Sequence, residues 1–224
     1  MTPISVDLLA ENYDGTVVAT QPNVIGPYCA SVGVTSAPQL DAGLGAFQST
    51  IQKAAGNLYG VLPFGDIDQS GLGRDIAAWF ILQPTLTSPH SLTANIVAQG
   101  YVVPPNGYSM LNPAFAVNRA GVGVIGTGIT NPDPNVAGGF PSTGFIQFSG
   151  FPRGNIIITG QGATSDDRFT GCPGPLAGRW GDYGAATVDA ATGFFYVANE
   201  YIPDATVFPR GPLTNWGTFI TRVH

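Results

Sequence analysis

Charged residues are scarce in this chain. Of its 224 residues only 10% are Asp, Glu, Lys or Arg, and Lys53 is the single lysine. A nucleic-acid-binding surface needs clustered Lys and Arg to displace counterions from phosphates, whereas the arginines here are scattered and the net charge is −6. The sequence therefore predicts no nucleic-acid partner.

Cysteine and histidine are rarer still, with two of each. Cys29 and Cys172 are too few for a metal cage and lie far apart in the sequence, so they form either one long-range disulfide or two buried thiols. His90 and His224 have no partner at zinc-ligand spacing, and a serine hydrolase needs a base beside its nucleophile. Neither zinc nor serine-hydrolase chemistry is predicted.

Long apolar runs are missing as well. No segment reaches the length of a membrane span, and the N-terminus lacks the basic segment and apolar core of a signal peptide. Low charge with abundant Gly, Thr, Asn and Pro is typical of extracellular proteins. We therefore expect no membrane partner, and a secreted or periplasmic protein whose chain shows no signal peptide.

Glycine and proline are plentiful, with 31 and 19 residues, and 44% of the chain is hydrophobic. Gly and Pro favour turns between short strands over long amphipathic helices. This much apolar surface also requires a folded core, and all-β domains of this length are common. The composition predicts a single all-β domain over 1–224.

Three segments share one pattern: an alternating strand, a short turn ending in Gly, and a second strand rich in β-branched and aromatic residues. They are residues 48–62, 112–126 and 184–199, with turn glycines Gly56, Gly121 and Gly193. The spacing predicts three β-hairpins. At the first of them, apolar residues over 47–58 also fall at helical spacing, but correspondence with the other two copies favours strands.

An aromatic-rich strand follows each hairpin, at 76–84, 143–150 and 215–223. A fourth strand ending in Gln-Gly follows the first two copies, at 94–100 and 155–162, and the third copy lacks it. Four antiparallel strands recurring in this order are typical of propeller blades that stack face to face.

The sequence thus predicts a partial β-propeller of three to four four-stranded antiparallel blades. Residues 41–105, 106–165 and 166–224 form three blades. Residues 1–40 form either a degenerate blade or the closing strand of the last one.

Three motifs are similar to those of a known protein family: Arg179 to Tyr183, the Asn-Glu-Tyr at 199–201 and the Asn-Trp-x-Thr at 215–218. Over these motifs the chain resembles the C-terminal half of a family of large secreted bacterial β-propeller proteins, loosely grouped with sialidase-like propellers. It departs from the family pattern at Gly184, where Ser is usual, and at Gly217, where a basic residue is common. The resemblance implies a propeller fold more than an activity.

Carboxylates are the best candidates for chemistry. Asp182 and Glu200, with Arg179, are the candidate catalytic residues, because a carboxylate pair can act as acid and base or hold Ca²⁺ or another divalent ion. The alternative is structural: Arg179 and Asp182 form an ion pair that locks the last blade, while Trp180 and Tyr183 pack between blades.

A second group of residues is suited to binding. Aromatic side chains and the Asp-rich loop at 165–178 would meet a ligand on one face of the disc, although His90 also fits a solvated turn. The candidate ligand-binding residues are Tyr183, Tyr201, Trp180, Trp216, Asp166, Asp167 and His90.

Two functions remain open at this point. The first is an extracellular-type module that binds a carbohydrate or similar ligand, and the second is a carboxylate-based hydrolase of esters, phosphoesters or glycosides. A half ring would also leave the flat faces of its end blades uncovered, so we expect self-association into a homodimer that completes the ring.

Overall fold

The named elements of the computed structural model are all strands. It describes residues 19–25, 30–37, 39–41, 49–89, 91–166, 178–180, 184–204 and 216–224, and at 178–179 only the backbone. A single helical turn at 30–31 is the one departure from strand and loop within these ranges, and no helix in them is long and apolar enough to cross a membrane. The all-β prediction is confirmed for this part of the chain.

The first sheet is an antiparallel meander in the order β2-β3-β4-β5. Its strands are β2 (Gln52–Ala54), β3 (Asn57–Ile67), β4 (Gly73–Ser88) and β5 (Ser91–Val102). The hairpin predicted at 48–62 is confirmed, since Ala54 pairs with Asn57 across the turn. The helical alternative at 47–58 is wrong for the described residues 49–58, because cross-strand pairing overrides the local spacing.

The second sheet repeats that order as β6-β7-β8-β9. Its strands are β6 (Ser109–Val117), β7 (Val122–Thr130), β8 (Ser142–Ser149) and β9 (Ile157–Gly160). Every residue of β6 is buried, because this strand lies between the other two sheets. The second predicted hairpin and the strands that follow it are confirmed.

The third sheet has three strands in the order β11-β12-β13. They are β11 (Ala185–Val188), β12 (Phe195–Tyr201) and β13 (Gly217–Val223). This confirms the third hairpin, and the described residues add no fourth strand to the sheet, as the sequence pattern predicted.

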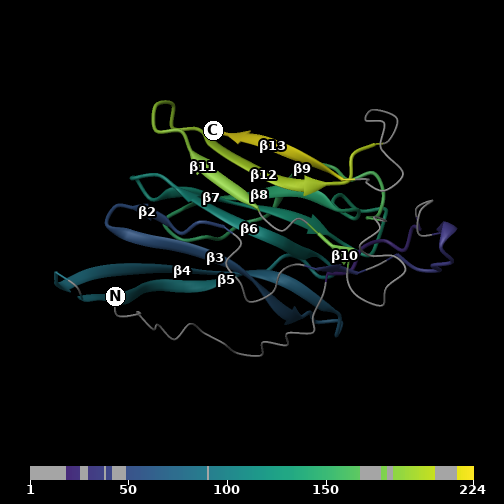
Figure 1. Cartoon of the computed structure of the whole chain (residues 1–224), viewed down its shortest axis with the longest axis horizontal. Helices are drawn as coiled ribbons and strands as arrows, with labels where there is room; N and C mark the ends of the chain where they lie inside the picture. The colour runs from purple at the N-terminus through teal and green to yellow at the C-terminus, as the bar shows by residue number, and fades with distance from the viewer. Residues whose placement is uncertain are drawn as a thin grey trace.

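The three sheets are stacked face to face, with the second in the middle (Figure 1). Tyr59 and Trp79 of the first sheet pack on Phe115 of the second in one core. Val124 and Phe145 on the opposite face of the second sheet pack on the third sheet in another core. Within the described residues no sheet closes on itself, and the three similar sheets form a stack.

A small parallel ribbon joins distant parts of the chain. Its strands are β1 (Leu40–Asp41) and β10 (Gly178–Arg179). Leu40 also bridges to Ala19, and both pack with Trp180 in a third, smaller core. Leu40 is therefore the residue of 1–40 that pairs with β10, and no described strand in 1–40 extends the third sheet.

Candidate functional site

The two ends of the stack differ in character. The hairpin turns at 55–56, 118–121 and 189–194 lie at one end, whereas the connections at 68–72, 103–108 and 131–141 lie at the other end, near β10 (Figure 1). We call the second one the loop end. Apart from Thr127, the buried polar and charged residues gather there: Gln21, Asp68, Arg74, Asp75, Ser109, Asn112, Thr130, Asn131, Ser142, Thr143, Ser165, Asp166 and Asn199.

Asp68 ties two of these connections together. Its Oδ1 accepts hydrogen bonds from the backbone N–H groups of Ser70 (2.8 Å) and Leu72 (3.0 Å), and from the Ser70 hydroxyl. Its Oδ2 accepts the N–H of Gly107 at 3.0 Å, in the connection between the first two sheets. The Ser70 hydroxyl and these N–H groups lower the pKa of Asp68 to about 2, because they stabilise the carboxylate.

Arg74, on β4, also binds the connection at 103–108. Its guanidinium forms an ion pair with Asp66 at 2.8 Å, and its Nη1 donates to the Pro104 carbonyl at 3.0 Å. The Arg74 side chain is buried, so the paired charge and the carbonyl bond together satisfy it. Asp68 and Arg74 thus fix the backbone at Pro104 and Gly107.

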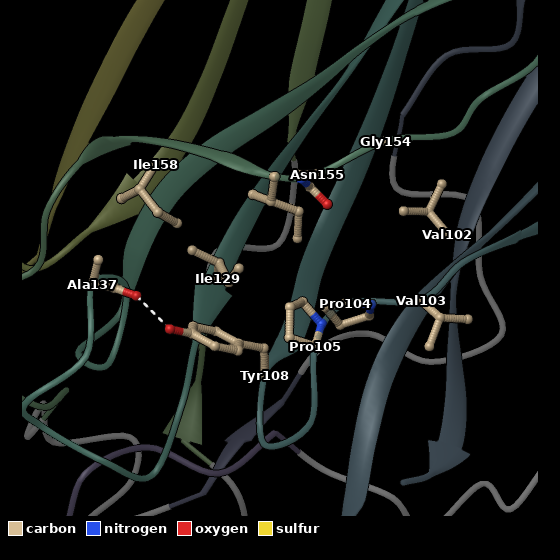
Figure 2. A pocket seen from close by; sticks show the side chains of 11 residues that line it. Val102, Val103, Pro104, Pro105, Tyr108, Ile129, Ala137, Gly154, Asn155 and Ile158 are labelled. Atoms are coloured by element: carbon tan, nitrogen blue, oxygen red, sulfur yellow. Dashed lines mark hydrogen bonds between the residues drawn. The ribbon is translucent and has the colours of Figure 1, made fainter. Parts of the chain in front are cut away.

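A pocket opens beside this fixed connection, between the first and second sheets (Figure 2). Its volume is about 470 Å³, within the range typical of small-molecule sites. The lining is mainly aliphatic, with one phenol ring and one side-chain amide: Val102, Val103, Pro104, Pro105, Tyr108, Ile129, Ala137, Gly154, Asn155, Ile156 and Ile158. No carboxylate, histidine, cysteine or lysine is among these residues.

Tyr108 gives the pocket its aromatic wall. Its hydroxyl donates to the Ala137 carbonyl at 2.8 Å, which joins the 103–108 connection to the 131–141 connection (Figure 2). Burial raises the pKa of Tyr108, and the negative charge of Asp133 raises it further. The phenol therefore stays protonated and remains a hydrogen-bond donor.

Asp75 is the most unusual acid of the loop end. It is fully buried on β4, and neither carboxylate oxygen has a hydrogen-bond partner among the described residues. Burial raises its pKa well above the ordinary value, and the nearby charge of Asp41 acts in the same direction. Asp75 therefore holds its proton to higher pH than an exposed aspartate, and its burial keeps it from direct contact with a ligand.

Of the predicted catalytic residues, the structure describes Glu200 and the backbone of Arg179. The backbone of Arg179 pairs with that of Asp41 in the ribbon. Glu200 is half-buried on β12, paired with Thr218. Asp182 lies outside the described residues, so the predicted ion pair with Arg179 remains a prediction.

None of the predicted ligand-binding residues that the structure describes is part of the pocket lining. Trp180 is buried in the core with Leu40 and Leu111. Asp166 is buried, and its backbone N–H and carbonyl bond the Gln21 side chain at 2.7 and 3.1 Å. The remaining two described residues are Tyr201, half-buried against Phe219, and the exposed Trp216. Tyr183, Asp167 and His90 lie outside the described residues, as do Cys29 and Cys172.

The backbone around Trp180 is fixed by two asparagines. Asn112 Nδ2 donates to the Trp180 carbonyl at 3.1 Å, and Asn199 Nδ2 donates to the Asn112 carbonyl at 3.3 Å. A Cβ atom at Gly184 would lie only 2.8 Å from Asn199 Nδ2 and would also overlap the Asn112 carbonyl. The absence of a side chain at position 184 therefore has a packing reason.

Sequence reasoning missed both Asp75 and the pocket. The signal for Asp75 was its parity in β4, since it alternates with Ala77, Trp79 and Ile81, which face the second sheet. A carboxylate at such an inward position is unusual in an otherwise apolar strand. The pocket had a weaker signal in the Val-Val-Pro-Pro-x-x-Tyr run at 102–108.

Within the described residues, no group of three His, Cys, Asp or Glu side chains is placed to hold a metal ion. Comparison of the chain with protein-family models and with curated proteins found no match to either.

Proposed function

We propose that this chain is a propeller-like module that binds its ligand in the pocket at the loop end. The repeated order of strands and their face-to-face stacking support blades of a propeller. In this interpretation the pocket lies between two adjacent blades, next to the connection from one to the other. The pocket carries the proposal, because its walls are fixed by Asp68, Arg74 and Tyr108.

The lining determines the class of ligand. Aliphatic side chains and two prolines favour burial of an apolar or aromatic group, and the Asn155 amide can bond one amide or hydroxyl of the ligand. A carbohydrate, the ligand class expected from the sequence, would need more hydrogen-bonding groups than this lining offers. We therefore propose an apolar group that carries one polar function, such as the side chain and neighbouring amide of a hydrophobic peptide.

Binding is favoured over hydrolysis in this pocket. A hydrolase would place an acid, base or nucleophile within reach of the bound group, and the lining has no carboxylate, histidine, cysteine or lysine. In this proposal the loop-end carboxylates Asp68 and Asp75 have structural roles and do not act on a ligand.

A probe panel tests this proposal. N-acetylated amides of Leu, Phe and Trp, together with mono- and disaccharides, are measured by ligand-observed NMR against the wild-type chain. Val103→Trp fills the pocket from a side chain that is 52% exposed, and Val97→Trp is the matched control on β5, at a residue that is 48% exposed and outside the pocket.

We expect the amides to bind the wild type and Val97→Trp, and to lose at least tenfold in affinity for Val103→Trp. Saccharide binding that survives Val103→Trp, or amide binding that is equal in all three proteins, would contradict the proposal.

A further inference from the structure

The third sheet ends in a strand that is paired on one side only. β13 pairs with β12 along its whole length, from Gly217 opposite Tyr201 to Val223 opposite Phe195, with no register shift. The first two sheets carry a further strand at the equivalent place, β5 and β9. No described strand pairs with the other edge of β13.

This edge lacks the features that usually prevent strand pairing. Natural edge strands are protected by lysines, prolines or bulges, and β13 reads Gly-Thr-Phe-Ile-Thr-Arg-Val, with one arginine as its only charge. Ile220 is 67% exposed on the face that turns away from the second sheet. A regular, exposed strand of this kind is a template for a further strand.

The inner face of β13 is already held in place. Phe219 packs against the backbone of Gly160, and the Thr221 hydroxyl donates to Thr159 Oγ1 at 2.8 Å, both on β9. The edge therefore does not have to be ordered before a partner strand binds, which lowers the entropic cost of association.

We propose that β13 pairs with β13 of a second copy of this chain, antiparallel and about a two-fold axis at Ile220. The two third sheets then form one continuous sheet in the order β11-β12-β13-β13-β12-β11. A two-fold contact of this kind is self-complementary and closed, so assembly stops at the dimer.

The register follows from side-chain parity. Outward residues must oppose outward residues, which places Ile220 opposite its own copy and Thr218 opposite Arg222. Within each copy Thr218 pairs with Glu200 of β12. Arg222 of one copy therefore lies in the same cross-strand row as Thr218 and Glu200 of the other copy. No like charges oppose each other, and the two exposed isoleucines cover one another.

A second copy fits the β13 edge better than it fits the outer face of the first sheet. On the outer face of the first sheet Ile76 and Phe80 are both buried, so the centre of that face offers little free apolar surface. The ring-closing contact expected from the sequence would need that face, whereas pairing through β13 does not.

Seven residue pairs bury less area than the ~1,600 Å² of a standard interface, so we expect a weak dimer that dissociates in the micromolar range. Sedimentation velocity from about 1 to 100 µM covers that range. Ile220→Lys places two ammonium groups together at the axis, and Leu86→Lys is the matched control at a residue that is 68% exposed on β4. Hydrogen exchange of the β13 amides is measured on the same samples.

We expect dimers for the wild type and for Leu86→Lys, a monomer for Ile220→Lys, and protection of the outer β13 amides that rises with concentration. Three results would overturn the proposal. They are a wild type that stays monomeric at every concentration, dimerisation that survives Ile220→Lys, or outer amides that are equally protected in monomeric Ile220→Lys. The last result would show that a segment of the same chain covers the edge.

Discussion

At the scale of single residues, Asp75 makes the folded state sensitive to pH. Its pKa is raised above the ordinary 3.8 by burial and by Asp41, so the folded chain keeps a proton that the unfolded chain releases. The contribution of Asp75 to the stability of the fold is therefore greatest below the pKa that it has in the unfolded chain. This contribution is lost as the pH rises toward the pKa that it has in the folded chain.

Asp75→Asn removes this charge while keeping the shape of the side chain. We expect the melting temperatures of variant and wild type to be similar near pH 4, and the variant to become the more stable protein as the pH rises to about 7. Thermal denaturation of both proteins across this range measures the difference. A variant that is less stable at pH 7 would mean that the Asp75 carboxylate is charged and stabilised in the folded state.

Asp68 has the opposite dependence. Its pKa is lowered to about 2, first by the Ser70 hydroxyl and then by the N–H groups of Leu72, Gly107 and Ser70. Its contribution is present above the unfolded pKa and is lost as the pH falls from about 4 to about 2.

We expect Asp68→Asn to be less stable than the wild type at pH 7 and to lose less stability between pH 4 and pH 2. Because Asp68 anchors Gly107, amide probes should also bind this variant more weakly, although position 68 is outside the pocket. Ser70→Ala, which removes only the hydroxyl donor, serves as a milder control. An acid profile of Asp68→Asn that superimposes on the wild type would contradict this account.

At the scale of elements, the hairpin turns show what the sequence could and could not reveal. Gly56, Gly121 and Gly193 all adopt positive φ, between 76° and 82°, as expected for glycines that end a turn. Asn118 and Asp189 also accept backbone N–H bonds from their own turns, so these two hairpins have clear local signals.

The first hairpin lacked such a signal. Ala55 adopts a φ of 48°, which a type I′ turn requires of its first central residue and which alanine disfavours. Ala-Ala-Gly therefore looks helical in isolation, and only comparison with the other two copies indicated strands. Long-range pairing of β3 with β4 provides the stabilisation that the turn residues do not.

Ala55→Asn tests this explanation. Asparagine tolerates positive φ, and Asn-Gly is the preferred pair for a type I′ turn, so we expect the free energy of unfolding to rise by about 0.5 to 1 kcal/mol. Chemical denaturation measures the change, with Ala55→Val expected to destabilise because a β-branched residue resists this backbone. Destabilisation by Asn would show that the turn differs from this geometry.

At the scale of the whole molecule, the rhythm of strands could be predicted because it repeats in the sequence. The missing strand of the third copy was visible for the same reason. The pocket was not, because stacking of two sheets brings Val103 and Tyr108 beside Asn155 and Ile158, and no local pattern encodes that approach. The partner of residues 1–40 was also left open, since the ribbon is set by a parallel contact with residues far along the chain.

The architecture of this molecule depends on similar sheets that pack face to face, with the second sheet between the other two. Inter-proton NOEs test it most directly at two contacts. The ring centroids of Tyr59 in the first sheet and Phe115 in the second lie 5.7 Å apart. Val197 of the third sheet packs over Gly126 of the second. We expect NOEs between the two rings and between the Val197 methyls and Gly126 Hα. Their absence, alongside intact NOEs within each sheet, would contradict the stack.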